Sequence, residues 1–450
     1  MQRITIKKLG PVDFFDTEMC QHNLFIGEQT SGKSTVAKGI YFCRNYKNIL
    51  RDALYDVCDT GTCEGKKING VKEFSLYIRD SVKRLFVDFF GPSWDLDRDL
   101  TLRYEFVPEK IWLCFSIEQE NGYINFEYSK KLAGEVNTLT SEAINRYRSK
   151  YPTQNALGMN SRERIRNQQF IRKELDRIFE DSEETYYIPA GRSLLTLLSG
   201  GGPLLYNQPL DYVTRQFLNV IGSIRRYFAR GIDGAFELYK TPDTRDTNSY
   251  AEAAQRVIHI LRANYYFVSN EEYLSVWTKQ GGDTKIPLNF ASSSQQECLW
   301  LLSLLYFLLL LRERAFVIIE EPEAHLYPTR QNDLLKFIAY FVNETGSTVL
   351  ITTHSPYVLT ALNTLYIAGR ALETDAKLKE QVEEIIGGNY AIRPGTFQAY
   401  KMELDSGPQN LMDIDDQELK TEMIDEVSET IMGNYMKIYH LMQGGDDDAE

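Results

Sequence analysis

The first 45 residues alternate between apolar and polar positions and then change period. An alternating run from Ile4 to Leu9 and an apolar run from Leu24 to Ile26 predict two strands. A glycine-bearing loop follows, and a helical pattern then extends from about Lys33 to Arg44. A strand, a loop and a helix in this order predict the opening of an α/β domain.

The middle of the chain changes from strand-like to helical patterns. Strand-like runs lie at Glu73 to Ile78, Leu85 to Phe90, Leu102 to Val107, Ile111 to Ile117 and Tyr123 to Tyr128. The pattern from about Ser141 to Asp181 is helical and charged. Tyr186 to Ala190 predicts a return strand, and more helix is expected up to about Tyr266.

Residues 290–370 predict a compact block of alternating helices and strands. The strands are expected at Phe316–Ile319, Thr348–Thr352 and Leu365–Ala368. The apolar run from Leu299 to Leu311 is shorter than the roughly 20 residues that cross a bilayer, so it predicts a buried helix. The tail begins helical after Arg370 and is expected to end in a disordered segment, 444–448.

These patterns divide the 450 residues into four segments. Residues 1–135 hold the N-terminal half of an α/β domain with a β-rich lobe, and residues 136–285 form a largely helical insertion. Residues 286–370 complete the α/β domain. Residues 371–450 are a C-terminal extension that ends in an acidic tail.

Charge is distributed unevenly. Residues 401–450 hold 14 acidic and 3 basic side chains, which accounts for most of the net charge of −13. The acidity therefore does not exclude nucleic-acid binding by the rest of the chain. A basic cluster could follow phosphates or an acidic partner, although a charge-rich helix is more often a solvated face. The cluster comprises Arg146, Arg148, Lys150, Arg162, Arg164, Arg166, Arg172, Lys173 and Arg177.

The N-terminus predicts the compartment. It shows no apolar region of a signal peptide. The six cysteines are scattered and are expected to stay reduced. We therefore expect a cytoplasmic protein with no membrane partner.

The strongest chemical signal is a phosphate-binding loop. Residues 27–34 match G-x-x-x-x-G-K-[ST] at every fixed position, with a strand before them and a helix after them. Backbone N–H groups of such a loop converge on phosphates, the Lys33 ammonium bridges β- and γ-phosphate oxygens, and the Ser34 hydroxyl ligates Mg²⁺. The predicted ATP-binding residues are Gly27, Glu28, Gln29, Thr30, Ser31, Gly32, Lys33, Ser34 and Thr35.

Two further signals follow predicted core strands. Glu320 and Glu321 come directly after Phe316–Ile319, at the carboxyl end where α/β sheets bind ligands. Glu320 suits Mg²⁺, and Glu321 suits a general base that polarises the attacking water. His354 closes the next strand and is placed to reach the γ-phosphate. A solvated acidic turn and a core histidine are the alternative interpretations.

The fourth signal heads the apolar helix. Ser292, Ser293, Ser294 and Gln295 precede it, and Ser294 with Glu297 fits a capping box. The functional interpretation adds that hydroxyls and free N–H groups at this helix start grip the γ-phosphate of ATP held by a partner subunit.

The order of these motifs resembles that of ABC-type ATPases. The runs 319–328 and 353–356 resemble the AAA-type ATPases of the OLD and RecF-like group. The run 187–193 and the signature are similar to the anti-phage defence ATPases of PARIS (AriA) and Septu (PtuA). The resemblance is sharp over residues 1–45 and 285–370. It implies an α/β P-loop NTPase fold, an ABC-type ATPase head with a helical insertion.

Two positions depart from the wider family. Ser294 stands where the signature usually has glycine, and its Cβ is expected to crowd the partner's phosphate and slow closure. Glu320 stands where transporters of the superfamily carry Asp, although Glu is common in the OLD-like group. A C-terminal Toprim nuclease would have no room in the roughly 80 residues after the head.

The resemblance implies a switch that binds and hydrolyses ATP with Mg²⁺ as a homodimer or higher homo-oligomer. A separate effector protein, a nuclease of Toprim or HNH type, is the expected partner in bacterial anti-phage defence. Two alternatives stay open. One is a RecF-like repair or replication ATPase that binds DNA directly, and the other is a nucleotide-gated scaffold with little hydrolysis, which Ser294 would favour.

Overall fold

The computed structural model describes residues 1–91, 99–117, 124–150, 161–199, 210–238, 247–277, 282–404, 407–412 and 419. Its helices are α1 Lys33–Thr60, α2 Val71–Phe90, α3 Lys130–Lys150, α4 Ser161–Phe179, α5 Arg192–Ser199, α6 Tyr212–Ile224, α7 Thr247–Leu261, α8 Ser293–Leu311, α9 Pro328–Thr345, α10 Pro356–Thr374 and α11 Lys379–Ile386. Its strands are β1 Arg3–Leu9, β2 Val12–Glu18, β3 His22–Gly27, β4 Thr62–Cys63, β5 Lys66–Lys67, β6 Thr101–Val107, β7 Ile111–Ile117, β8 Ile124–Tyr128, β9 Glu184–Ile188, β10 Asn264–Val268, β11 Glu271–Trp277, β12 Asp283–Pro287, β13 Ala315–Glu320, β14 Thr348–Thr353, β15 Phe397–Met402 and β16 Gln409–Asn410.

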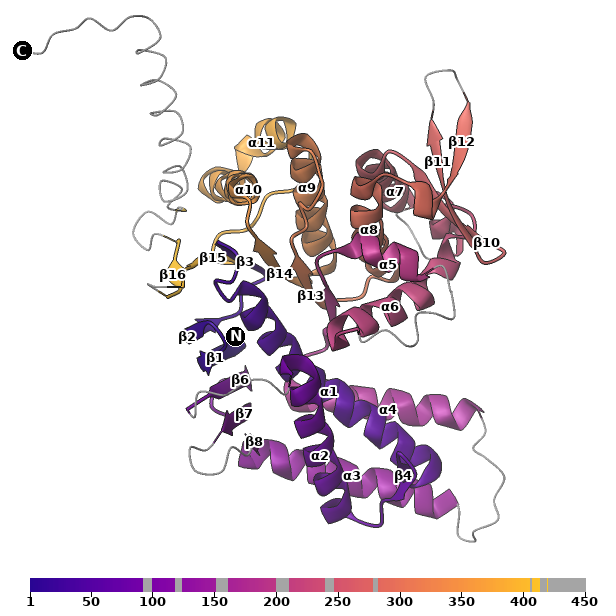
Figure 1. Cartoon of the computed structure of the whole chain (residues 1–450), viewed down its shortest axis with the longest axis vertical. Helices are drawn as coiled ribbons and strands as arrows, with labels where there is room; N and C mark the ends of the chain where they lie inside the picture. The colour runs from indigo at the N-terminus through magenta and orange to yellow at the C-terminus, as the bar shows by residue number, and fades with distance from the viewer. Residues whose placement is uncertain are drawn as a thin grey trace, which may run out of the picture.

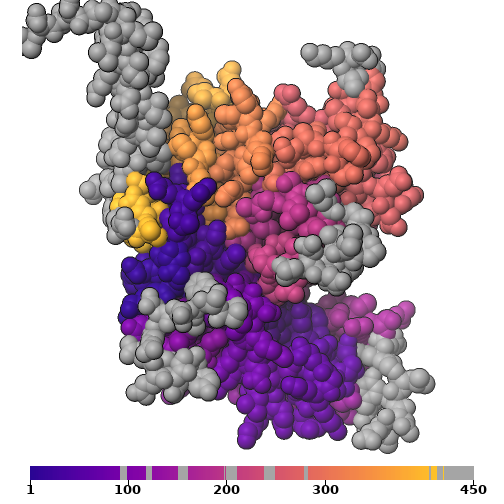
Figure 2. Space-filling model, viewed as in Figure 1, coloured from indigo at the N-terminus to yellow at the C-terminus, as the bar shows by residue number. Residues whose placement is uncertain are grey.

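A six-stranded sheet organises the molecule, in the order β16-β15-β3-β14-β13-β9 (Figure 1). The pairs from β15 to β9 are all parallel, and β16 is antiparallel at the edge. Every residue of β13 is buried, as expected for a parallel strand covered on both faces. Because β15 pairs with β3, residues near the two ends of the described chain lie against each other, indigo beside yellow in Figure 2.

The sheet separates two hydrophobic cores. Phe316 and Ile318 of β13 face a core that includes α1, α2 and a five-stranded antiparallel sheet, β2-β1-β6-β7-β8. Val317 and Ile319 face the other core, which includes α8, α9 and α10. Alternate side chains of a strand point to opposite faces, so this one strand ties the two cores together.

Aromatic packing fixes α1 against its neighbours. The Phe42 ring lies 4.7 Å from the Phe115 ring of β7 and 5.5 Å from the Phe86 ring of α2, measured between centroids. Both contacts have the edge-to-face geometry that aromatic pairs prefer. The helix that follows the phosphate-binding loop is thereby held at its middle, and it continues to Thr60, well beyond the predicted end at Arg44.

Two of the predicted strands in the β-rich segment are wrong. Glu73 to Ile78 and Leu85 to Phe90 both lie in α2. Its buried side chains include Phe74, Ile78, Val82 and Phe86, each four residues after the last, which is a helical period. The three later strands of this segment are confirmed as β6, β7 and β8, apart from Tyr123, which lies outside the described residues.

The C-terminal strands also differ from the prediction. Leu365–Ala368 lies inside α10, and the strand that completes the sheet is β15, about 30 residues later in the chain. The strand prediction failed because a short apolar run does not distinguish a buried helix from a strand. Strands β2 and β10 to β12 were missed, whereas β9, β13 and β14 confirm the predicted strands. The predicted disorder of 444–448 falls outside the described residues.

Helix α8 is the buried apolar helix that the sequence predicts. It is long and apolar enough to cross a membrane by length and composition, but 72% of its most apolar window is buried inside the protein. Trp300, Leu301 and Leu302 are among its fully buried residues. The helix is therefore the centre of the second core.

Candidate functional site

Two glycines shape the loop between β3 and α1. An added Cβ at Gly27 would lie 2.2 Å from the backbone oxygen of Met402, so the neighbouring β15 leaves no space for a side chain. Gly32 has φ 93°, and a Cβ there would lie 2.5 Å from Cγ2 of Val12. Only glycine meets both demands, since it alone combines free φ with close backbone approach. The loop can therefore wrap tightly before the helix begins at Lys33.

Lys33 is the buried cation of this loop. Its Nζ donates to the backbone oxygens of Gly27 at 2.9 Å and Glu28 at 2.5 Å, and to Oγ of Ser31 at 3.2 Å. Burial lowers the pKa of Lys33 to about 8, and nearby carboxylates, Glu321 first, oppose this shift. Neutral carbonyl groups stabilise the ammonium less than an anion would. The site is therefore suited to an added negative charge.

Glu321 and His354 meet Lys33 from the next two strands. Nδ1 of His354 lies 3.4 Å from Nζ of Lys33, and Nε2 lies 3.3 Å from Oε1 of Glu321. Glu321 has a left-handed backbone, with φ 43°, and its N–H donates to the Thr352 oxygen at 2.8 Å. A left-handed conformation is uncommon for a residue other than glycine and is often found at functional sites. This turn places the carboxylate beside the histidine.

A cavity of about 620 Å³ opens where these strands end. Its lining includes seven of the nine residues predicted to bind ATP, together with Glu321 and His354. Gly27 and Glu28 contribute through the backbone oxygens that hold Lys33. Pro11 and Leu404, which the sequence analysis did not single out, also line the cavity. They flank the loop as apolar surfaces, and no motif marks them.

Glu320 is the last residue of β13, directly before Glu321, and is 7% exposed; the described cavity lining does not include it. Its Oε2 accepts a hydrogen bond from the N–H of Ala190 at 3.2 Å, its buried Oε1 has no hydrogen-bond partner by geometry among the described residues, and the buried Tyr187 side chain interacts with the same carboxylate. A carboxylate oxygen fits the coordination shell of a hard cation, and so does the hydroxyl of Ser34, which is an exposed residue. Within the described chain no group of three or more His, Cys, Asp or Glu is placed to hold a metal. Mg²⁺ at a phosphate site needs only one or two protein ligands, so Ser34 and Glu320 fit it.

Glu323, which lies in the run 319–328, is a site residue to which the sequence motifs assign no role. Its Oε1 accepts hydrogen bonds from the Thr353 hydroxyl and from the N–H of His354, the latter at 3.3 Å. Burial raises the pKa of its carboxyl group. Glu323 therefore joins the turn after β13 to the end of β14 and holds the backbone of His354 in place.

The serine-rich signature lies at the start of α8. Ser292 caps the helix: its Oγ accepts from the N–H of Gln295 at 3.4 Å, and its own N–H donates to Oε1 of Gln295 at 3.2 Å. The capping box is therefore Ser292 with Gln295, and the predicted pair of Ser294 with Glu297 is wrong, because the helix begins two residues earlier. Ser292 and Ser293 are exposed, and the described cavity lining includes neither of them.

The carboxylate of Glu297 has a different partner. Its two oxygens accept hydrogen bonds from the N–H groups of Arg192 and Ser193, both at 2.9 Å. This connection is not evident from the sequence, since Arg192 and Glu297 are 105 residues apart in the chain. The sequence signal that points toward it is the run 187–193, which contains Arg192 and Ser193.

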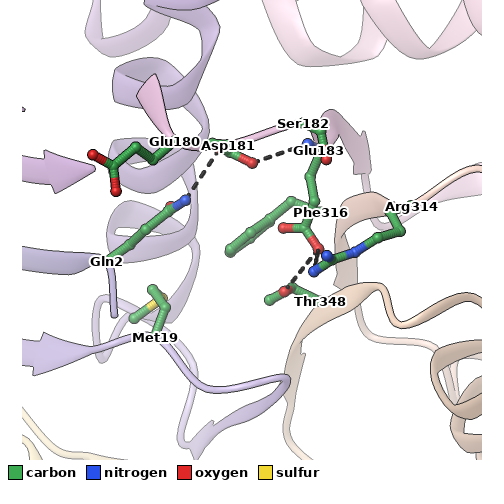
Figure 3. Close-up of a pocket in the computed structure, with 9 residues that line it drawn as sticks. All are labelled: Gln2, Met19, Glu180, Asp181, Ser182, Glu183, Arg314, Phe316 and Thr348. Carbon is green, nitrogen blue, oxygen red and sulfur yellow. Dashed lines mark hydrogen bonds and ion pairs between the residues drawn. The ribbon is translucent and has the colours of Figure 1, made fainter. Parts of the chain in front are cut away.

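A second hollow lies near the amino ends of β9, β13 and β14, whereas the cavity lies at the carboxyl ends of β13 and β14. Figure 3 shows the residues that line this hollow. It has a volume of about 210 Å³. Thr348 donates to Oε1 of Glu183 at 3.2 Å, Arg314 lies 3.4 Å from the same carboxylate, and Gln2 donates to Asp181 at 3.1 Å (Figure 3). These polar groups form their hydrogen bonds and ion pair with one another. The hollow is therefore lined by a polar network that connects the starts of β9, β13 and β14.

The chain was compared with solved structures, curated proteins and protein-family models. Solved structures to which the chain is similar include the SmcHead bound to the C-winged helix domain of ScpA, at 10% identity and TM-score 0.39, covering 94% of this chain and 98% of that one. A second is the SMC head domain from Thermotoga maritima, at 11% identity and TM-score 0.34, covering 80% of this chain and 90% of that one. A third is the Smc head domain with an extended coiled coil bound to the C-terminal domain of ScpA derived from Pyrococcus furiosus, at 9% identity and TM-score 0.36, covering 96% of this chain and 100% of that one. No curated protein matches the sequence.

A protein-family model matches residues 23–360, well over half of the chain. Its description is "AAA domain, putative AbiEii toxin, Type IV TA system". The match spans the phosphate-binding loop, the acidic turn after β13 and the histidine after β14. The chain therefore belongs to this AAA domain family and has the P-loop NTPase fold of an ABC-type ATPase head.

Proposed function

We propose that the protein is an ATPase that works as a molecular switch. The observation that carries this proposal is the convergence of Lys33, Glu321 and His354 on one cavity from three neighbouring parallel strands. The cavity lies at the carboxyl ends of these strands, where α/β sheets bind nucleotides. The helix N-terminus at Lys33 adds a partial positive charge that favours phosphate there.

The residues divide the reaction between them. Lys33 exchanges loop carbonyls for β- and γ-phosphate oxygens, Glu321 accepts the proton of the attacking water, and His354 contacts the γ-phosphate. Ser34 and Glu320 would hold Mg²⁺, which when bound supplies positive charge against the phosphate oxygens. Most of the acceleration in such a reaction comes from positioning and charge stabilisation, which this set of side chains is placed to provide.

The active form is proposed to be a homodimer, with Ser292, Ser293, Ser294 and Gln295 of one subunit facing the ATP of the other. Two features support this arrangement. Ser292 and Ser293 are exposed, and none of the four signature residues lines the cavity of its own subunit. Large exposed aromatic side chains flank the motifs: Phe290 precedes the signature and is 76% exposed, and Tyr357 follows His354 and is 62% exposed. A dimer interface over these motifs would remove the apolar surface of both rings from water.

The output of the switch is proposed to be control of a separate effector, a Toprim or HNH nuclease, in bacterial anti-phage defence. The family description names a putative toxin of a type IV TA system, which supports a two-component role. The similarity of the run 187–193 to the PARIS and Septu ATPases supports the same role. A cytoplasmic location follows from this role.

The alternative of direct DNA binding rests on the basic cluster of α3 and α4. The structure pairs several of these cations within the chain. Arg164 lies 2.7 Å from Asp59, Arg172 lies 3.8 Å from Glu184, and Arg177 contacts both Glu135 and Glu174 at 2.9 Å. Paired cations release fewer counterions on binding a phosphate backbone, so this observation favours the switch over the DNA-binding ATPase.

Phosphate release from Mg²⁺-ATP, measured over a range of protein concentrations, tests the proposal. We expect turnover that depends on Mg²⁺ and rises more steeply than linearly with protein concentration. ATP binding without phosphate release would favour the nucleotide-gated scaffold. A mobility shift with duplex DNA that weakens when Arg166 and Lys173 are replaced by glutamate would favour the DNA-binding alternative.

A further inference from the structure

The guanidinium of Arg192 is fully buried and bonds to the backbone of both acidic site residues. Its Nη1 donates to the backbone oxygen of Glu320 at 2.6 Å, and its Nη2 donates to that of Glu321 at 2.9 Å. Nη1 also donates to the Pro189 oxygen at 3.1 Å. One rigid fork therefore holds the turn in which Glu321 takes its left-handed conformation.

The other edge of the same guanidinium holds the signature helix. Nε of Arg192 donates to the backbone oxygen of Glu297 at 2.7 Å and lies 3.5 Å from its Oε2. The Glu297 side chain is 1% exposed and accepts the N–H groups of Arg192 and Ser193. Glu297 lies about one helical turn after Ser293. Arg192 thus connects the start of α8 directly to the backbone of the proposed base.

Stability alone gives a weak account of this pair. Removing two charges from water costs several kcal/mol per ion, and apolar replacements of buried ion pairs are often neutral or stabilising. Here desolvation even lowers the pKa of the Arg192 guanidinium. The four acceptors come from three separate elements, and two of them belong to the acidic turn. The bonds are therefore arranged to set the relative position of these elements.

We propose that Arg192, with Glu297, is a positioning residue that couples the signature to the catalytic carboxylate of the same subunit. This inference rests on the proposed ATPase function. When the signature grips ATP in the partner subunit, a shift of the start of α8 moves Glu297, and Arg192 transmits the shift to the carbonyls of Glu320 and Glu321. Each subunit's base then responds to the occupancy of the other composite site.

The test replaces Arg192 with lysine, which keeps the charge and removes the fork. We expect ATP affinity to stay within about twofold, because Lys33 and its loop are untouched, and kcat to fall about tenfold or more, as a small misplacement of a catalytic group does. In the Glu321→Gln background the same change should alter the residual single-turnover rate less than about twofold, because Arg192 acts through the base. Glu297→Gln should reproduce both results.

Arg44→Lys is the matched control. Arg44 is also a fully buried arginine with bonds to two acids, Asp181 at 2.9 Å and Glu183 at 3.9 Å, but it lies at the opposite end of the sheet. The variant Arg44→Lys should lower the melting temperature as Arg192→Lys does, but it should leave kcat unchanged. If Arg192→Lys does not fold, Glu297→Gln replaces it, and failure of both to fold would assign the pair to folding alone and overturn the proposal.

The remaining outcomes separate the two hypotheses. Wild-type protein that hydrolyses no ATP contradicts the proposed function before any variant is compared. Wild-type protein that hydrolyses ATP while Arg192→Lys turns over equally fast contradicts only the coupling. If Arg192→Lys lowers the residual single-turnover rate in the Glu321→Gln background as much as it lowers kcat in the wild type, the coupling is also contradicted.

Discussion

Nε2 of His354 lies 3.3 Å from Oε1 of Glu321 at the mouth of the cavity. The opposite nitrogen, Nδ1, faces the Lys33 ammonium, which is a donor only. A hydrogen bond between these two groups therefore requires the His354 tautomer that carries its proton on Nε2, directed at the carboxylate. The histidine thus connects the cation that holds phosphate to the carboxylate that is proposed to activate water.

Replacing Glu321 with glutamine should separate binding from hydrolysis. The amide keeps the size of the side chain but does not accept the proton of the attacking water, so we expect ATP binding to persist and kcat to fall by about 10² or more. Nucleotide binding and phosphate release measure the two effects. Glu384→Gln, on the exposed side of α11, is the control and should match the wild type. Equal turnover by wild type and Glu321→Gln would mean that another residue is the base.

Lys33→Ala should abolish ATP binding. The ammonium is the cation of the loop, and without it the loop itself offers the phosphates only backbone N–H groups and hydroxyls. Isothermal titration with ATP measures the effect, with Lys38→Ala, further along the same helix, as the control that retains binding. An affinity for ATP in Lys33→Ala within about threefold of the wild type would show that nucleotide binds elsewhere.

The lowered pKa of Lys33, about 8, predicts proton uptake on ATP binding. At about pH 9 most of the free protein carries neutral Lys33, and bound phosphates restore the ammonium, so binding should take up close to one proton. At about pH 7 Lys33 is already charged, and uptake should be small. ATP affinity should therefore fall as the pH rises above about 8. Calorimetry in buffers of different ionisation enthalpy measures the uptake, and equal uptake at both pH values would contradict the prediction.

The phosphate-binding loop, the acidic turn and the histidine were predicted from the sequence because each is a local motif at the end of an apolar strand. Residues such as Arg192 were not assigned a role, because their function depends on contacts between elements more than 100 residues apart. The period of α2 was misinterpreted because its aromatic and β-branched residues favour strands locally, and packing against Phe42 overrides that preference. Strand β15 was missed because its register on β3 is a tertiary property.

Trans complementation tests the central claim, that each ATP is shared between two subunits. Lys33→Ala and Ser293→Arg should each be inactive alone, the first through its phosphate-binding loop and the second through its signature. In a mixed dimer one composite site holds an intact loop and an intact signature, while the other carries both lesions.

The measurement is phosphate release as Lys33→Ala is titrated into Ser293→Arg at constant total protein. Random exchange makes about half of the dimers mixed at an equal ratio, so activity should return with a maximum at that ratio. Subunit exchange is followed separately by labelling each variant with a different fluorophore. No recovery in subunits that exchange, or a monomer whose ATPase rate per subunit is independent of concentration, would contradict the account.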